Sequence, residues 1–226
     1  MTVITIHKNE ALDREMYIAF HELSVAGVDF GKEIIDSHPN ITVANHKKYI
    51  KDYYHNHQTE MAEMVKNTQR ELDMKSEDFF LELEKYFGKD YSGKNYVGFA
   101  SIFNCNPRFV ENETFQIFYL KKPAYRIEVC FHEITHFAFF DFCKEQVHRT
   151  HELDTNNGPL WELSEIVNII LLNQPDFQKL ICMEESLFYP TLKAKLEGVR
   201  VIWEQEGQAV SASFVCKSLE YLEKIK

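Results

Sequence analysis

The chain has 226 residues, enough for one domain of ordinary size, and 45% of them are hydrophobic, including 18 Phe and 11 Tyr. This aromatic content excludes an intrinsically disordered chain. The formal charge is −10, and no run of Lys and Arg is longer than two residues. These features argue against nucleic acid as a partner, because binding to phosphates depends on clustered cations.

The N-terminus lacks the basic start and apolar core of an export signal. The longest apolar runs, IVNIILL at 166–172 and FAFFDF at 137–142, are too short to span a bilayer. The five cysteines are odd in number, scattered and without a CxxC pair, which is typical of reduced thiols. We therefore expect a cytoplasmic protein with no membrane partner.

In chain order, the first strong pattern is residues 42–72, which lack Gly and Pro and predict one long helix or two abutting helices. Ser76 can cap a further helix over 77–87, and Gly88 can end it. Between 89 and 123 the composition changes, since Gly, Asn and Ser alternate with Val, Phe, Ile and Tyr. This pattern predicts a strand over 114–120 and a second over 96–103.

Pro123 suits the first turn of a helix over about 124–143, and Asn157 can cap a helix over about 159–173. Residues 176–226 predict two or three more helices. We therefore expect a single, mainly helical α+β domain over 1–226. Its predicted parts are a helical N-terminal part (1–88), a small antiparallel sheet (89–123) packed on the central helix, metal-site helices (124–173) and C-terminal helices (174–226).

The central helix carries the sequence FHEITHF at 131–137. Positions four apart on a helix differ by about 40° and lie about 6 Å apart along the axis, so His132 and His136 can bind one metal ion. Glu133 is turned about 100° from His132, which suits a general base acting on water rather than a ligand. Cys143 lies about 10 Å beyond His136 along the axis, too far for a zinc–sulfur bond of about 2.3 Å. The flanking residues are apolar, so buried imidazoles here need a partner, and a metal supplies one.

A catalytic zinc ion usually has three protein ligands. A histidine six residues after His136 would complete one known pattern, but that residue is Phe142. The segment GPLWELSEIVNIILL offers Glu162 and Glu165 instead. Glu162 lies in the first helical turn, where the helix dipole already favours a carboxylate, whereas Glu165 lies among apolar residues and needs a partner. Asn168 is either an outer partner of the site or an ordinary polar residue.

HEITH followed by LWELSE resembles the gluzincin clan of zinc metallopeptidases, in which the third ligand is a glutamate on the next helix. The resemblance covers about 45 residues and implies one zinc ion bound by His132, His136 and Glu165, with Glu133 as the base. It also implies a zincin-like fold. From His136 to Glu165 is 29 positions. That is longer than the roughly twenty usual in the clan, so Glu162 stays an alternative ligand.

The clan also places a strand before the HExxH helix, and the free edge of that strand pairs with an extended substrate. Residues 114–120 occupy this place, either as such an edge or as an ordinary structural strand. Attack of water on a peptide carbonyl forms an oxyanion, which needs a stabilising group besides the zinc ion. Tyr189 in LFYP is our candidate, with His148 and His151 as alternatives. His55 and His57 are two apart on a predicted helix and read as surface residues.

The sequence thus predicts a zinc-dependent peptide hydrolase with Glu133 and Tyr189 as catalytic residues and a peptide or protein substrate. One alternative is a zinc-binding regulatory or scaffold protein whose HExxH site is vestigial. Another is a metal-free helical binding module in which the motif is accidental. The sequence carries no signal for the oligomeric state or for cleavage specificity.

Overall fold

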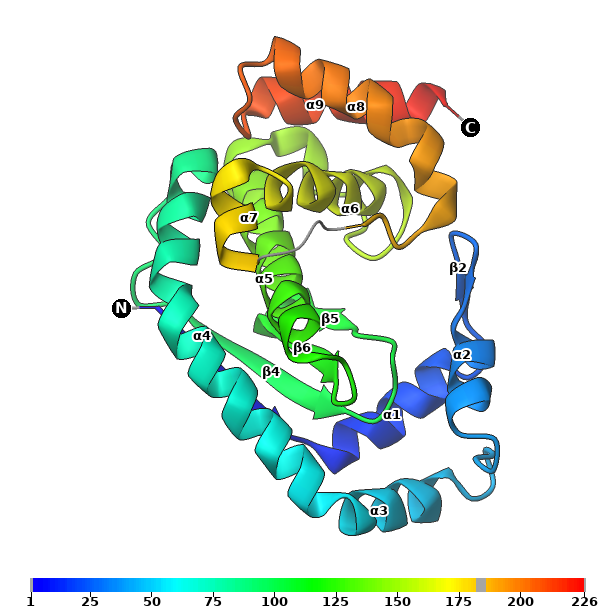
Figure 1. Cartoon of the computed structure of the whole chain (residues 1–226). Coiled ribbons are helices and arrows are strands. Elements are labelled where there is room, and N and C mark those ends of the chain that lie inside the picture. The colour runs from blue at the N-terminus through cyan, green and yellow to red at the C-terminus, as the bar shows by residue number, and fades with distance from the viewer. Residues whose placement is uncertain (1, 182–185, 226) are drawn as a thin grey trace. The chain divides into compact units, whose positions relative to one another are not determined.

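The computed structural model describes residues 2–181 and 186–225 (Figure 1). Within these residues the chain is mainly helical, with one four-stranded and one two-stranded sheet, so the predicted mainly helical α+β class is confirmed. None of the described helices is both long enough and apolar enough to cross a membrane.

The chain groups into two compact units, each built from separate stretches of sequence. One unit contains Val3–Ser76 and Asn95–Cys130, and we call it the sheet unit. The other contains Met1–Thr2, Glu77–Lys94 and Phe131–Lys226, and we call it the helical unit. The prediction of a single domain stays a prediction.

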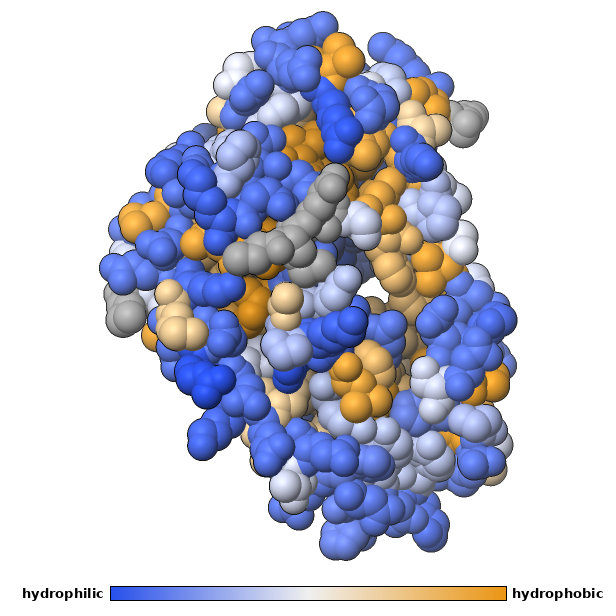
Figure 2. Space-filling model, viewed as in Figure 1, coloured by the Kyte–Doolittle hydropathy of each residue, from blue (hydrophilic) through white to orange (hydrophobic). Residues whose placement is uncertain are grey.

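The sheet unit contains all the strands of the described residues. Its elements are β1 (Val3–Lys8), α1 (Glu10–Phe20), β2 (Ser24–Val25), β3 (Val28–Asp29), α2 (Phe30–Ser37), α3 (His46–Asn56), the first part of α4 (Gln58–Phe87), β4 (Asn95–Ser101), β5 (Arg108–Phe109), a 3-10 turn (Val110–Asn112), β6 (Thr114–Phe118) and the start of α5 (Pro123–Gln146). The larger sheet has the order β1-β4-β6-β5. In Figure 2 the outer surface of α3 and α4, at the lower left, is mostly hydrophilic.

The prediction of an antiparallel sheet is wrong. β1 pairs with β4 in parallel, β4 pairs with β6 in parallel, and only β5 and β6 are antiparallel. The N-terminal strand was missed, although its sequence VITIHK alternates branched apolar with polar residues. Its buried side chains are Ile4 and Ile6. Parallel neighbours need long crossover connections, which here contain helices α1 to α4 between β1 and β4.

The strands predicted at 96–103 and 114–120 form as β4 and β6. Of the two alternatives for 114–120, the edge strand that pairs with a substrate is wrong, because β6 is not an edge strand. It lies between β4 and β5. Beyond the short β5, the Gln116 amide donates to the Pro107 carbonyl at 2.9 Å, and the Phe118 amide donates to the Asn106 side chain at 2.9 Å. These backbone groups are therefore already satisfied and do not offer an extended peptide a pairing edge.

The edge of β1 is also covered, by a side chain of α4. The Gln69 side chain accepts a hydrogen bond from the Ile6 amide at 3.0 Å and donates one to the Ile4 carbonyl at 2.8 Å. A glutamine amide thus replaces the backbone of a missing neighbour strand. This contact blocks edge-to-edge pairing at β1.

The helix predicted over 42–72 forms as two abutting helices, α3 and α4, which are separated at His57. His57 stacks on Tyr53 and pairs with Glu60 at 2.8 Å, and His55 is exposed, so both are surface histidines as expected. The predicted helix start at Ser76 is wrong, because α4 continues through it to Phe87. The Ser76 hydroxyl donates to the Leu72 carbonyl one turn back, which lets a serine remain inside a helix.

A buried carboxylate joins α1 to the sheet. Asp13 has no exposed surface, and one of its oxygens accepts from the Ser101 hydroxyl (2.6 Å) and the Gln116 amide (2.8 Å). The other oxygen accepts from the Tyr54 hydroxyl (2.8 Å) and the Ile102 backbone amide (2.9 Å). Burial raises the pKa of Asp13 to about 6, against the effect of these four donors.

The helical unit contains the remaining helices. They are the end of α4, α5 from Phe131 onward, a 3-10 turn (His148–Thr150), α6 (Gly158–Leu172), α7 (Pro175–Ile181), a 3-10 turn (Pro190–Leu192), α8 (Lys193–Gln205) and α9 (Ala212–Lys224). Figure 1 shows α8 and α9 side by side over α6. The rings of Phe79 and Phe131 stack 3.9 Å apart, and both are fully buried.

Local signals set the end of α4 and the starts of α5 and α6 as predicted. α5 begins at Pro123, and the Asn157 side chain caps α6 by accepting from the Gly158 amide at 2.8 Å. Gly88 ends α4 with a φ of +64°, a left-handed conformation that glycine adopts without strain. Among the described residues after 174 there are three α-helices, which agrees with the two or three that were predicted.

Candidate metal site

Two buried helices of the helical unit supply the candidate site. α5 carries His132, Glu133 and His136 on adjacent turns, and α6 carries Glu165. Every residue of α6 from Leu160 to Leu172 is buried except Glu162, which is partly exposed. Polar side chains on such a helix require partners, since an unpaired buried polar group costs a few kcal/mol.

The two imidazoles and the Glu165 carboxylate converge. The Nε2 atoms of His132 and His136 are 3.0 Å apart. One Glu165 oxygen lies 3.4 Å from Nε2 of His136, and the other lies 3.6 Å from Nε2 of His132. The α6 carboxylate therefore meets both histidines of the HExxH motif.

These separations fit one metal ion. Donors at about 2.0–2.1 Å from a tetrahedral ion lie about 3.3–3.4 Å from one another. The observed separations of 3.0, 3.4 and 3.6 Å bracket this value. Two imidazole nitrogens and a carboxylate are also a donor set that transition metals favour.

Glu133 belongs to the same cluster. One ligand atom from each of His132, Glu133 and His136 lies within 4.8 Å of the others, so this group could hold a metal ion. Glu133 is 5% exposed. It follows His132 directly on the helix, so its carboxylate approaches from a different side than Glu165 does.

Neighbouring residues hold the histidines in place. The Asn168 side-chain amide donates to the backbone carbonyl of His132 at 3.0 Å, and Asn168 is fully buried. Asn168 lies one turn after Glu165, so α6 contacts α5 at two successive positions. The Phe140 ring stacks on His136 with an interplanar angle of 10°. Asn168 is thus bonded to the backbone of α5 at His132, and its role as an outer partner of a metal stays a prediction.

Glu162, the alternative third ligand, lies elsewhere. Its carboxylate pairs with Lys195 on α8 at 2.6 Å, and the two side chains are 19% and 16% exposed. The first-turn position thus places Glu162 in an ion pair, while Glu165 lies beside the histidines. The structure brings only Glu165 of the two to the imidazoles.

Tyr189 lies near the start of α6. Its ring contacts Trp161 edge to face, with centroids 4.9 Å apart. Trp161 is four residues before Glu165 and so lies on the same face of α6, one turn toward its start. The assignment of Tyr189 as an oxyanion donor stays a prediction.

The alternative donors in the loop lie at the far end of α5. Nε2 of His151 is 2.9 Å from the backbone carbonyl of Lys144, and the rings of His148 and His151 are 4.9 Å apart. Lys144 is eight residues after His136, or about 12 Å further along the helix axis. In this structure His151 therefore does not lie over the imidazoles.

None of the described cysteines belongs to the group of potential metal ligands. Cys143 is buried beyond His136, and burial raises the pKa of its thiol, so it stays protonated at neutral pH. Cys105, Cys130 and Cys216 are, like Cys143, not in a disulfide. Cys182 lies outside the described residues.

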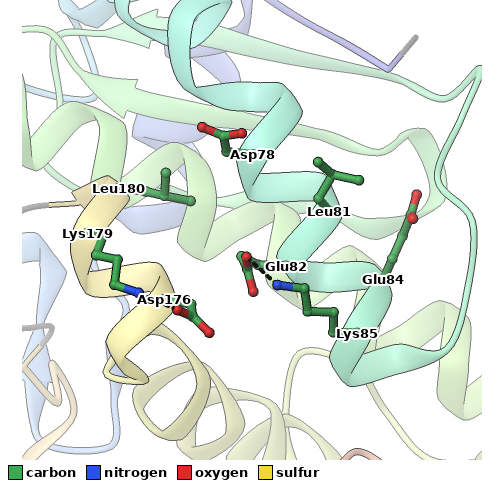
Figure 3. A pocket seen from close by; sticks show the side chains of 8 residues that line it. All are labelled: Asp78, Leu81, Glu82, Glu84, Lys85, Asp176, Lys179 and Leu180. Atoms are coloured by element: carbon green, nitrogen blue, oxygen red, sulfur yellow. Dashed lines mark hydrogen bonds and ion pairs between the residues drawn. The ribbon is translucent and has the colours of Figure 1, made fainter.

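A groove of about 670 Å³ lies between the end of α4 and α7 in the same unit (Figure 3). Four of its charged side chains form pairs along their own helices. Lys85 contacts Glu82 at 2.6 Å, and Lys179 contacts Asp176 at 2.6 Å. These pairs are typical of a solvated helix surface, so the groove is a weaker functional candidate than the buried cluster.

Comparisons of the chain with protein-family models, with curated proteins and with solved structures give no match.

Proposed function

We propose that the protein is a zinc-dependent hydrolase of peptide bonds, with a zincin-like arrangement of α5 and α6. The observation that carries the proposal is the convergence of His132, His136 and Glu165 within 3.6 Å. The same two-histidine, one-glutamate set binds catalytic zinc in known metallopeptidases. The peptide substrate rests on the resemblance of HEITH and LWELSE to the gluzincin clan.

His132, His136 and Glu165 would hold one zinc ion. When bound, the ion supplies a Lewis acid and lowers the pKa of a coordinated water toward about 7. Glu133 would accept the proton of the attacking water and deliver it to the leaving amine. Its burial keeps the carboxylate away from bulk water and close to the imidazoles. Tyr189, whose ring contacts Trp161 near the start of α6, would donate a hydrogen bond to the oxyanion.

The deciding experiment separates metal binding from hydrolysis. Glu133→Gln should retain about one equivalent of zinc by elemental mass spectrometry and lose at least about a hundredfold in peptide hydrolysis. The matched control is Glu162→Gln, because Glu162 is on α6 but pairs with Lys195. It should keep both zinc and activity. Wild-type hydrolysis by Glu133→Gln would refute the assigned base.

A second function is favoured by the burial of the site. The His136 side chain is 0% exposed and that of Glu165 is 4%, and only His132, at 19%, reaches the surface. Closed sites are typical of structural zinc. A non-catalytic zinc protein would bind one equivalent of zinc, hydrolyse no peptide in a diverse library and lose stability when the zinc is removed. Zinc well below half an equivalent in untagged protein would refute both functions.

A further inference from the structure

A small cavity lies between α4 and the first turn of α5 in the sheet unit. Its volume is about 180 Å³, and its lining residues are Asn67, Thr68, Arg70, Glu71, Pro123 and Arg126. Pockets for drug-sized ligands are usually about 300–1,000 Å³. The cavity therefore suits an ion or a very small molecule.

Arg126 is the most unusual residue of this lining. It is 7% exposed, and its one hydrogen bond is a long contact of 3.4 Å from Nη1 to the Met64 carbonyl. Its Nε is buried and has no hydrogen-bond partner among residues 2–181 and 186–225. Within the same residues no carboxylate pairs with it. A guanidinium stays protonated in proteins, so a positive charge is buried here without a counter-ion, which is costly.

The surroundings of Arg126 are positive on balance. Arg70 also lines the cavity, is exposed and has no ion-pair partner in the part of the chain that the structure describes. Glu71 is the one acid of the lining and pairs with neither arginine there. Two cations and one anion leave a formal charge of +1 in a chain whose net charge is −10. The first turn of α5 adds the positive end of a helix of 24 residues.

We propose that this cavity binds a small oxyanion, of the phosphate or carboxylate class, with Arg126 as its buried anchor and Arg70 at its mouth. A planar guanidinium donates two parallel hydrogen bonds to such an anion. The anion supplies the counter-charge of the buried cation. This proposal is independent of the metal site.

The test is calorimetric titration of the full-length protein with inorganic phosphate and, separately, with acetate at matched ionic strength. Wild type should bind one anion saturably. Arg126→Met, which keeps the apolar stem, should bind at least about tenfold more weakly. Arg126→Lys should also bind more weakly, because lysine lacks the paired donors. The control Arg200→Met removes an exposed arginine that pairs with Glu197 and should bind within about twofold of wild type.

Hydrogen exchange of wild type locates the site and does not depend on any variant folding. Phosphate or acetate should slow exchange in peptides covering 64–71 and 123–130. The anion that does so identifies the ligand class. Wild type that binds neither anion saturably overturns the proposal. A folded Arg126→Met variant that binds the anion as well as wild type also overturns it. Protection from exchange that is confined to other peptides does the same.

Discussion

The buried carboxylate of Asp13 makes the stability of the sheet unit depend on pH in an unusual direction. Its pKa rises from the ordinary 3.8 to about 6 on folding, because burial disfavours the charged form. The folded state therefore binds more protons than the unfolded state between these values, and stability falls as pH rises through them. A difference of about 2.2 pKa units corresponds to about 3 kcal/mol, of which about 2 kcal/mol is lost between pH 4 and pH 7.

The donors of Asp13 explain how either form is accommodated. Tyr54 donates to the carboxylate at 2.8 Å, but its oxygen is also 3.1 Å from the Ala100 carbonyl. When Asp13 is protonated, Tyr54 can donate to Ala100 and accept from the new carboxylic acid. The neutral carboxylic acid therefore loses no partner, which is consistent with the raised pKa.

The variant Asp13→Asn cannot titrate, so the difference in unfolding free energy between wild type and variant isolates this group. That difference should shrink by about 2 kcal/mol from pH 4 to pH 7. Both tryptophans lie in the helical unit, so the assay is hydrogen exchange of β4 peptides, supported by circular dichroism. A control of opposite sign is Asp90→Asn in the helical unit, followed there by tryptophan fluorescence, because hydrogen bonds from Ser92 lower the pKa of Asp90. A wild-type-minus-variant difference that is constant or grows with pH would refute the reasoning for Asp13.

Three further predictions concern the helical unit. Glu165→Gln should lower zinc affinity by at least about a hundredfold while Glu162→Gln leaves it unchanged, as measured by competition with a chelator; equal effects would reject the ligand assignment. Asn168→Ala, which removes the side chain that holds the backbone of α5, should weaken zinc about 10-fold to 100-fold in the same assay, and an unaltered affinity would count against its role. Phe131→Ala should cost about 3–5 kcal/mol in denaturant unfolding, whereas Leu81→Ala, which is 51% exposed, should change it by less than about 0.5 kcal/mol.

Local chemistry accounts for the parts of the fold that were predicted. Pro123, Asn157 and Gly88 set helix ends through their own backbone preferences, and these positions are visible in sequence. The parallel pairing of β1 with β4 joins Val3 to Asn95, 92 positions apart. No turn residue encodes a contact at that distance, so the sheet was given the wrong direction.

The candidate site also has a part that the sequence predicts and a part that it does not. The spacing of His132, Glu133 and His136 follows from one helix, so their convergence was predictable from the motif alone. The preference for Glu165 over Glu162 came from burial. The helix dipole already stabilises the Glu162 carboxylate in the first turn, whereas Glu165 lies among apolar residues, where the dipole offers no such explanation. The Lys195 that pairs with Glu162 arrives from α8, 33 positions away. That ion pair could not be read from the sequence.

Arg126 lies outside the HExxH motif, and no role was predicted for it from the sequence. The signal was present, as a lone arginine in RIEVCFHEITHFAFF stands among buried residues. The same argument that favoured Glu165, that a buried charge needs a partner, applies to it with equal force. That this charge is unpaired is visible only in the structure, where no carboxylate of the described residues forms an ion pair with Arg126.

Access, rather than the positions of the donors, separates the two functions proposed for the metal site. Both functions use the same convergence of His132, His136 and Glu165. Hydrolysis also requires a carbonyl group to come within a few ångströms of the ion and of Glu133. Within the described residues His132, with 19% of its side chain exposed, is the most accessible of the three proposed ligands, because His136 and Glu165 are enclosed. A substrate must therefore approach across His132, and an extended strand at β6 cannot guide it, since both sides of that strand are paired.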